Sequence, residues 1–241
     1  GLGDVYKRQY SPSSIAEFAV TQAINIVRNQ NDIQRKLREY DFRWEPSILS
    51  RSISDLTVAV IGTGRIGSIA ASIFAKEYGS HVVAYDPFPN EKVGQYVEYK
   101  DTLEETLRDA DIVTVHIPAT KYNPHLFNRD LFSKFKKGAV FVNAARGSIV
   151  DTRALLDAID SGQIKGAALD TYEHERGLFP GDYRDKVIND DLLDELIARE
   201  DIWLTPHIAF YTDAAVKNLI VDALDAVIDV INTGTTKLRV N

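Results

Sequence analysis

Cysteine and methionine are both absent from this chain of 241 residues. Without cysteine there can be no disulfide, thiol nucleophile or thiolate metal ligand. No apolar run reaches the roughly 18 residues that a membrane-spanning helix needs, and no secretory signal pattern is visible. Acidic residues outnumber basic ones by 35 to 28, and the resulting net charge of −7 disfavours a nucleic-acid partner. These absences predict a cytoplasmic protein that binds neither membrane nor nucleic acid.

The chain begins with Gly1 rather than methionine, and residues 1–9 show no useful periodicity. We expect these residues to be a non-native leader or a scar of sequence assembly, and we exclude them from the fold.

The most informative stretch is TVAVIGTGRIG, residues 57–67. Its apolar run 58–61 predicts a strand that is buried on both faces. Gly62, Gly64 and Gly67 then form G-x-G-x-x-G, and apolar residues recur at helical spacing from Arg65 onward. In a dinucleotide-binding turn these glycines allow the tight turn, the approach of a pyrophosphate and close helix packing. A lone motif of this kind can also be an ordinary turn.

A second feature supports the nucleotide interpretation. The apolar stretch 81–85 predicts the next strand, and it ends in Asp86, which lies 86 − 62 = 24 residues after the first glycine. An acid about 20 residues after that glycine binds the adenosine ribose in dinucleotide-binding folds. A carboxylate there also repels a 2′-phosphate, which favours NAD over NADP. The alternative is that Asp86-Pro87 merely begins a turn.

Predicted strands and helices alternate from residue 57 to residue 205, which indicates an α/β fold of the Rossmann type, a doubly wound parallel sheet. The expected strands are 58–61, 81–85, 111–116, 138–143, 166–169 and 202–205, with a short one near Val97. The expected helices are 11–29, interrupted and resuming through 33–37, and then 65–78, 102–109, 130–135, 151–159, 190–198 and 212–231. Ligands bind beyond the carboxyl ends of such strands.

Several chemically capable residues follow directly after predicted strands. Arg146 offers a two-pronged donor suited to a carboxylate, although it could also be a surface arginine. His207 follows the last strand, and Asp170, Glu173 and Glu175 are candidate carboxylate partners that would favour its protonated form. A single histidine can equally be structural, as we expect for the other four. No residues have zinc-ligand spacing, so we expect no metal.

Six segments, in this order along the chain, resemble the D-specific 2-hydroxyacid dehydrogenase family. They are YSPSSIAE (10–17), VIGTGRIG (60–67), AYDP (84–87), VNAARG (142–147), DTYEHE (170–175) and TPHIAFYT (205–212). The resemblance implies an NAD-dependent oxidoreductase that interconverts a 2-oxo acid and a D-2-hydroxy acid, most closely pyruvate and D-lactate. It also implies a homodimer for the full-length protein.

The resemblance also implies roles for individual residues. His207 would be the acid/base, Glu175 its partner and Arg146 the clamp on the substrate carboxylate, with Tyr10 and Phe210 near the substrate. The residues implied at the cofactor are Gly62, Gly64, Arg65, Ile66, Gly67, Asp86, Ile117, Pro118, Asn123, Ala144, Ala145, Arg146 and Asp170.

The match departs from the family at the N-terminus, where family members carry a further segment that forms most of the substrate-binding domain. We therefore expect an N-terminally truncated chain in which that domain is largely missing. Residues 10–209 would be the NAD-binding domain, and 210–241 would return to the substrate domain. Two alternatives stay open: a D-2-hydroxyisocaproate, other branched-chain or 3-phosphoglycerate type dehydrogenase, and a catalytically silent NAD-binding regulator of the same fold.

Overall fold

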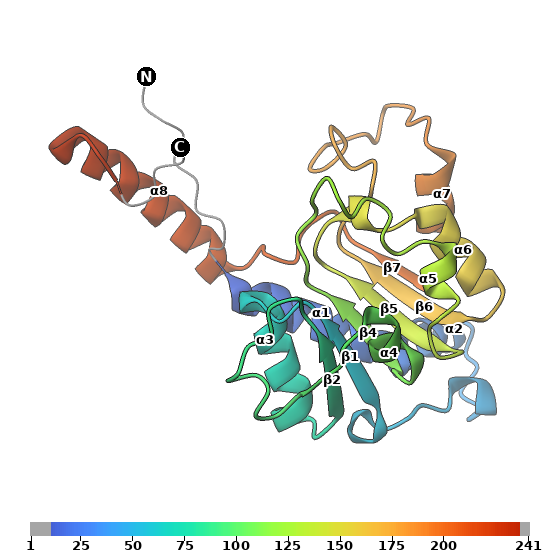
Figure 1. Cartoon of the computed structure of the whole chain (residues 1–241). Helices are drawn as coiled ribbons and strands as arrows, with labels where there is room; N and C mark the ends of the chain where they lie inside the picture. Colours follow the sequence, from blue (N-terminus) through green and yellow to red (C-terminus); the bar gives the residue numbers. More distant parts are fainter. Residues whose placement is uncertain (1–10, 237–241) are drawn as a thin grey trace.

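The computed structural model describes residues 11–236, and these form one seven-stranded parallel sheet with helices on both faces (Figure 1). The strand order is β3-β2-β1-β4-β5-β6-β7, and every neighbouring pair is parallel. This arrangement confirms the predicted Rossmann-type fold. The described residues contain no second sheet besides this one.

The strands are β1 (Thr57–Ile61), β2 (His81–Tyr85), β3 (Glu98–Tyr99), β4 (Ile112–Val115), β5 (Ala139–Asn143), β6 (Ile164–Leu169) and β7 (Ile202–Leu204). The α-helices are α1 (Pro12–Val27), α2 (Gln30–Arg38), α3 (Arg65–Ser72), α4 (Leu103–Arg108), α5 (Arg129–Phe132), α6 (Thr152–Asp160), α7 (Asp191–Ala198) and α8 (Asp213–Thr233). Short helical turns are η1 (Pro46–Ile48), η2 (Ile53–Asp55), η3 (Ile73–Glu77) and η4 (Gly147–Ile149).

Two hydrophobic cores lie on opposite faces of the sheet, because successive side chains of a strand point to opposite sides. Val58 and Val60 of β1 belong to the core that α1 and α3 cover, whereas Ala59 and Ile61 belong to the core beneath α4 to α7. All four side chains are buried, as expected for a continuous apolar strand in the middle of a parallel sheet.

Helix α1 begins as the sequence predicts, with Pro12 in its first turn after the N-cap Ser11. The spacing of mainly apolar residues in the sequence predicts one buried stripe at positions 15, 18, 19, 22, 23, 26 and 27, and the structure differs from it in part. Ala16 and Val20 are buried, whereas Ile15 and Phe18 are only half-buried. Because α1 packs against both α3 and the sheet, small side chains at 16 and 20 allow the close approach, and the larger ones lie at its rim.

Some predicted boundaries were wrong by a few residues. The helix after the glycine turn is α-helical only to Ser72 and continues as one π-helical turn, η3. Strand β6 begins at Ile164 rather than Gly166, and the expected helix 130–135 is the single turn α5. The expected interruption near residue 29 is confirmed, because Asn29, with a left-handed φ of 52°, separates α1 from α2.

Helix α8 projects away from the sheet and its covering helices (Figure 1). Its N-cap Thr212 accepts a hydrogen bond from Ala215 N, and its hydroxyl lies 2.9 Å from the Ser14 hydroxyl of α1. Gly234, with a φ of 75°, ends the helix. Among residues 11–236 no helix is both long enough and apolar enough to span a membrane.

Candidate active site

The predicted site residues lie along one edge of the sheet, where the carboxyl ends of the parallel strands meet. The glycine turn follows β1, Asp86 follows β2 and the segment 117–118 follows β4. Residues 144–146, Asp170 and His207 come after β5, β6 and β7. The strand order reverses direction between β1 and β4, which is where open α/β sheets bind dinucleotides.

Two of the three glycines in the turn between β1 and α3 leave no room for a side chain. Gly62 has a φ of +90°, and an added Cβ would lie 2.8 Å from Cγ2 of Ile117. A Cβ on Gly67 would overlap the carbonyl oxygen of Gly62, so α3 packs directly on the turn. Gly64 differs, because no heavy atom lies within 4 Å of the position that its Cβ would take.

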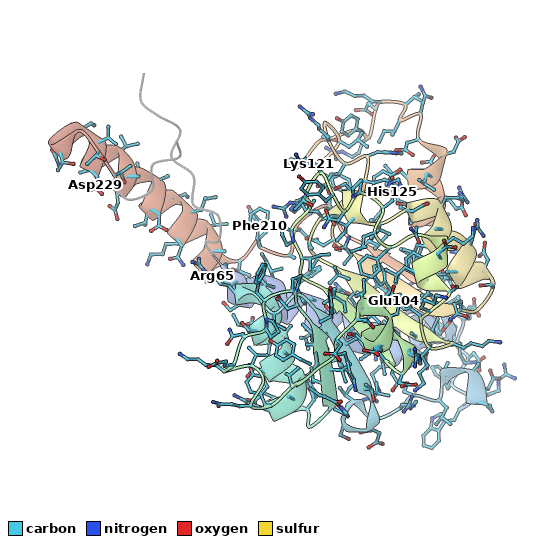
Figure 2. The ribbon with its side chains drawn as sticks, viewed as in Figure 1. Arg65, Glu104, Lys121, His125, Phe210 and Asp229 are labelled. Atoms are coloured by element: carbon cyan, nitrogen blue, oxygen red, sulfur yellow. The ribbon has the colours of Figure 1, made fainter. Side chains whose placement is uncertain are left out.

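The open space at Gly64 lies at a helix N-terminus, a position that favours an anion. Gly64 is the N-cap of α3, and the first N–H groups of a helix have no partner within it. Arg65, which is exposed, and Ile66, which is half-buried, are the first two residues of the helix. Figure 2 shows Arg65 on the side of the molecule from which α8 projects.

The carboxylate of Asp86 is turned back onto the glycine turn. Its Oδ2 accepts hydrogen bonds from the backbone N–H of Thr63 at 2.7 Å and from the Thr63 hydroxyl at 3.1 Å. Its Oδ1 accepts one from Phe88 N at 2.9 Å. A carboxylate offers about four acceptor positions, so Oδ1 can still accept a hydrogen bond from a ribose hydroxyl.

The loop after β4 is closed by Asn123. Its Nδ2 donates to the carbonyl of Pro118 at 2.9 Å, and its Oδ1 accepts from Thr120 N at 2.6 Å. Ile117 at the start of this loop lies against Gly62. The loop is therefore a compact wall beside the glycine turn.

Asn143, which is fully buried at the end of β5, fixes the turn that carries Arg146 through hydrogen bonds to its backbone. Asn143 Oδ1 accepts from Ala145 N at 3.0 Å, and its Nδ2 donates to the Arg146 carbonyl at 2.9 Å. Gly147 leaves no room for a Cβ against the backbone of Tyr172. The exposed guanidinium of Arg146 is thus mounted on a turn that is packed against the loop after β6.

That loop brings Glu175 to His207. The His207 Nδ1 and Glu175 Oε1 atoms are 2.9 Å apart, and Glu175 Oε2 accepts a further hydrogen bond from Tyr172 N at 3.0 Å. The two side chains are 37% and 21% exposed, so the pair is accessible without being fully solvated. With Nδ1 bonded to the carboxylate, Nε2 of His207 is the nitrogen left to exchange a proton.

The pair shifts the pKa of each partner. Burial by itself would raise the pKa of Glu175, but hydrogen bonds from His207 and from Tyr172 N lower it overall. The hydrogen bond to Glu175 raises the pKa of His207 against the opposing effect of burial. The positive charge of Arg146 acts on both groups, since it favours ionised Glu175 and disfavours protonated His207. This places Arg146 within electrostatic range of the pair.

Asp170 anchors the segment that carries His207. Its buried carboxylate accepts hydrogen bonds from the Thr205 hydroxyl at 2.7 Å, Ile208 N at 2.8 Å and Ala209 N at 2.9 Å. Its carbonyl accepts from His207 N at 2.8 Å. His207 has a φ of 55°, a strained value for a histidine, and these bonds hold it there. Burial raises the pKa of Asp170 despite the hydrogen bonds that oppose it.

Sequence reasoning missed the structural role of Glu173. Its Oε1 accepts from Thr152 N at 2.9 Å, at the start of α6, and its Oε2 lies 2.8 Å from Nε2 of His125. Glu173 thereby joins the loop after β4 to the loop that carries Glu175. The spacing of Glu173 and Glu175 in the sequence does not say which of the two faces His207.

The remaining predicted residues are less central. Phe210 packs edge-on against Tyr211, with ring centroids 6.0 Å apart, and Figure 2 shows it on the segment between the sheet and α8. Tyr10 lies outside the described residues. Burial lowers the pKa of His116 to about 4, so this histidine is neutral at pH 7. Residues 11–236 contain no group of three or more His, Asp or Glu side chains placed to hold a metal ion.

Comparison with known families gives a direct match. Residues 20–209 match the family model described as "D-isomer specific 2-hydroxyacid dehydrogenase, NAD binding domain". The chain is 47% identical over 232 residues to a D-lactate dehydrogenase of Staphylococcus aureus (strain MRSA252), covering 96% of this chain and 70% of that protein. A D-lactate dehydrogenase of Streptococcus pyogenes serotype M1 is also 47% identical over 232 residues, with the same coverage.

Solved structures are similar over the same length. A D-lactate dehydrogenase from Treponema pallidum matches with a TM-score of 0.92 and 39% identity, covering 97% of this chain and 70% of that one. A D-lactate dehydrogenase from Lactobacillus jensenii, solved with NAD+, matches with a TM-score of 0.90 and 34% identity, covering 100% of this chain and 72% of that one.

Proposed function

Because the chain belongs to the D-isomer specific 2-hydroxyacid dehydrogenase family, we propose how its residues contribute to that family's reaction. The protein is an NAD-dependent oxidoreductase that interconverts a 2-oxo acid and a D-2-hydroxy acid, with pyruvate and D-lactate as the pair. The observation that carries the assignment of roles is the His207–Glu175 pair, at 2.9 Å, on the same sheet edge as the glycine turn and Arg146.

The cofactor would extend along the carboxyl edge of the sheet. Its pyrophosphate would lie at Gly64 and the N-terminus of α3, and Asp86 would accept a hydrogen bond from the adenosine ribose. The open space at Gly64 and the acceptor position left on Asp86 support these two contacts. Ile117, Pro118 and Asn123 would form one wall of the site. Ala144, Ala145 and Asp170 would lie near the nicotinamide end, because they follow β5 and β6.

Bound NADH supplies the hydride that reduces C2 of the 2-oxo acid. Arg146 would bind the substrate carboxylate through its planar guanidinium and orient the carbonyl. His207 would donate the proton from Nε2 to the carbonyl oxygen as negative charge develops there. Glu175, bonded to Nδ1, would fix the tautomer of His207 and stabilise its charged form before transfer. In the reverse direction neutral His207 would accept the hydroxyl proton.

The roles are tested on residues 1–241 and on the same residues extended by the N-terminal part of the S. aureus relative. NADH binding is measured by fluorescence titration, and turnover by NADH oxidation with pyruvate and bulkier 2-oxo acids. We expect His207→Gln to abolish most turnover of the extended protein while NADH binding changes little. If His207→Gln and Glu175→Gln each left both the rate and its pH profile unchanged, the proposed pair would be wrong.

The same comparison tests the domain boundaries, which we propose as 10–209 for the NAD-binding domain and 210–241 for the return to a substrate domain. The side chains exposed on α8 support this division: Leu219, Ile220, Val221, Leu224, Val227, Ile228 and Ile231. Such a continuous apolar surface is usually covered by another part of the protein. We expect residues 1–241 alone to bind NADH but to reduce pyruvate negligibly, since a substrate domain would position the substrate and exclude water.

We further propose that the full-length protein is a homodimer. After α2 the chain presents Tyr40, Phe42 and Trp44 to solvent, with exposures of 83%, 67% and 98%. Ion pairs from Lys36 to Asp41 and Glu45 hold this segment in place. Exposed aromatic side chains on a rigid segment are typical anchors of protein interfaces. Light scattering of the wild type and Trp44→Ala tests the dimer, which we expect to weaken in the variant.

A cytoplasmic location, with neither nucleic acid nor membrane as partner, also belongs to the proposal. The acidic net charge supports it. Fractionation of cells that produce the protein, followed by immunodetection, tests it.

A further inference from the structure

A linear series of hydrogen bonds, termed the file below, runs from Asn90 through Tyr99 and Thr63 to the carboxylate of Asp86. The backbone N–H of Asn90 donates to the Tyr99 hydroxyl at 3.1 Å. The Tyr99 hydroxyl donates to Oγ1 of Thr63 at 2.7 Å, and Oγ1 of Thr63 lies 3.1 Å from Oδ2 of Asp86. Tyr99 belongs to β3 at the edge of the sheet, whereas Thr63 lies inside the glycine turn.

The direction of this file is fixed by its two ends. A backbone N–H can only donate, and an ionised carboxylate can only accept. Each of the two hydroxyls between them has one proton, so Tyr99 must donate to Thr63 and Thr63 must donate to Asp86. Hydrogen bonds aligned in this way polarise one another. The Thr63 side chain is buried, with a residue exposure of 2%, so water does not readily replace its bonds.

The file also restricts where the Asp86 carboxylate can go. Oδ2 receives two hydrogen bonds from Thr63, and Oδ1 receives one from Phe88 N. Rotating the carboxylate away from the glycine turn would break all three. The position therefore combines a fixed negative charge with a single open acceptor position on Oδ1.

We propose that Thr63 and Tyr99 determine the choice between NADH and NADPH by holding Asp86 in this orientation. A free 2′-hydroxyl can donate to Oδ1, whereas a 2′-phosphate brings negative charge against a carboxylate that cannot move aside. Thr63 acts directly on Asp86, and Tyr99 acts through Thr63. The inference rests on the proposed role of Asp86 and adds the residues that make its selectivity effective.

The test is the ratio of the NADPH and NADH dissociation constants, measured by fluorescence titration of residues 1–241. We expect Thr63→Val, which keeps the shape and loses the hydroxyl, to lower this ratio about tenfold, the effect of one hydrogen bond to a charged group. Tyr99→Phe should lower it by less. Because Tyr99 acts through the Thr63 hydroxyl, the double variant should match Thr63→Val alone rather than add to it.

Two controls separate selectivity from general damage. Tyr96→Phe removes a neighbouring tyrosine hydroxyl that bonds to the Ser68 carbonyl at 3.3 Å and not to this file, so it should leave the ratio unchanged. Thr63→Ser keeps the hydroxyl and should therefore keep most of the wild-type preference for NADH over NADPH. If Thr63→Val does not fold, as judged by circular dichroism, the other two variants test the proposal. A lower ratio in Tyr99→Phe with a retained ratio in Thr63→Ser supports it, and an unchanged ratio in Tyr99→Phe overturns it.

The outcomes distinguish this inference from the proposed function. A wild-type protein that binds NADH and NADPH equally well would overturn both the role of Asp86 and the inference. A wild-type preference that Asp86→Ala removes but Tyr99→Phe and Thr63→Val leave intact would overturn only the inference. Additive effects of the two substitutions would show that Tyr99 does not act through Thr63.

Discussion

Changing Gly67 of the glycine turn to alanine should destabilise the fold, whereas changing Gly64 to alanine should weaken NADH binding. At Gly67 the new methyl group would lie far inside 3.0 Å of the Gly62 carbonyl oxygen, and a backbone atom cannot rotate away. Forcing extra volume into a packed site costs roughly 1–3 kcal/mol and occasionally more. We therefore expect Gly67→Ala to lose about 3 kcal/mol of stability, which corresponds to a fall in Tm of roughly 6–12 °C for a protein of this size.

At Gly64 the expectation reverses. Its φ of −64° suits alanine, and no heavy atom lies within 4 Å of the added carbon. Stability should change by no more than about 0.5 kcal/mol, as for other substitutions in open positions. The methyl group would instead occupy the space proposed for the pyrophosphate. Loss of one charge-assisted hydrogen bond there should weaken NADH binding roughly tenfold or more.

Thermal and urea unfolding without cofactor measure the first effect, and NADH fluorescence titration of the folded protein measures the second. Gly94→Ala is the matched control, because its nearest neighbour would lie at an ordinary 3.5 Å and it lies outside the turn. The reasoning about the turn is refuted if Gly67→Ala is as stable as the wild type. It is equally refuted if Gly64→Ala binds NADH with unchanged affinity.

Three further predictions concern the other end of the site and the core. Glu175→Gln should lower the pKa of His207, because the hydrogen bond that raises this pKa would then go to an uncharged acceptor. A ¹H NMR titration checks this, with the His207 signal assigned by its loss in His207→Gln, and an unchanged pKa contradicts it. Asp170→Asn should cost about 1–3 kcal/mol, since an amide cannot accept all the donors that reach the buried carboxylate; urea unfolding with unchanged stability would exclude that anchoring role. Between pH 6.5 and about 4 the unfolded chain binds a proton at His116 that the folded chain excludes, so the contribution of His116 to stability falls as pH falls in this window. His116→Gln should flatten that part of the stability profile, and a profile of unchanged slope would count against it.

Local patterns in the sequence were sufficient for the order of the elements. The run 58–61 predicts a buried strand because it is apolar at every position, and the spacing of three glycines predicts the turn that follows it. The helices predicted at 151–159 and 212–231 begin there in the structure, where Asp151 and Thr212 are the N-caps. These predictions succeed because each depends on residues that are neighbours along the chain.

Boundaries were less predictable where packing overrides local preference. The apolar spacing after the glycine turn continues past Ser72, yet the helix changes there to the π-helical turn η3. In α1 the expected positions 19, 22, 23, 26 and 27 are buried, but Ile15 and Phe18 are only half-buried, whereas Ala16 and Val20 are buried. The burial on α1 depends on its contacts with α3 and the sheet, which periodicity within one segment cannot reveal.

The His207–Glu175 pair marks the limit of what the residues themselves determine. Three acids in the segment 170–175 could each have faced His207, and only the resemblance to a family singled out Glu175. In the folded chain Glu175 reaches the imidazole, Glu173 bonds to Thr152 N and His125, and Asp170 holds the backbone beside the histidine. His207 lies more than thirty residues further along the chain, and the parallel pairing of β6 with β7 brings the two loops together. The sequence by itself therefore determined which groups are available at the sheet edge. Only the tertiary structure decided which of them meet, because hydrogen-bond partners are chosen by positions in space.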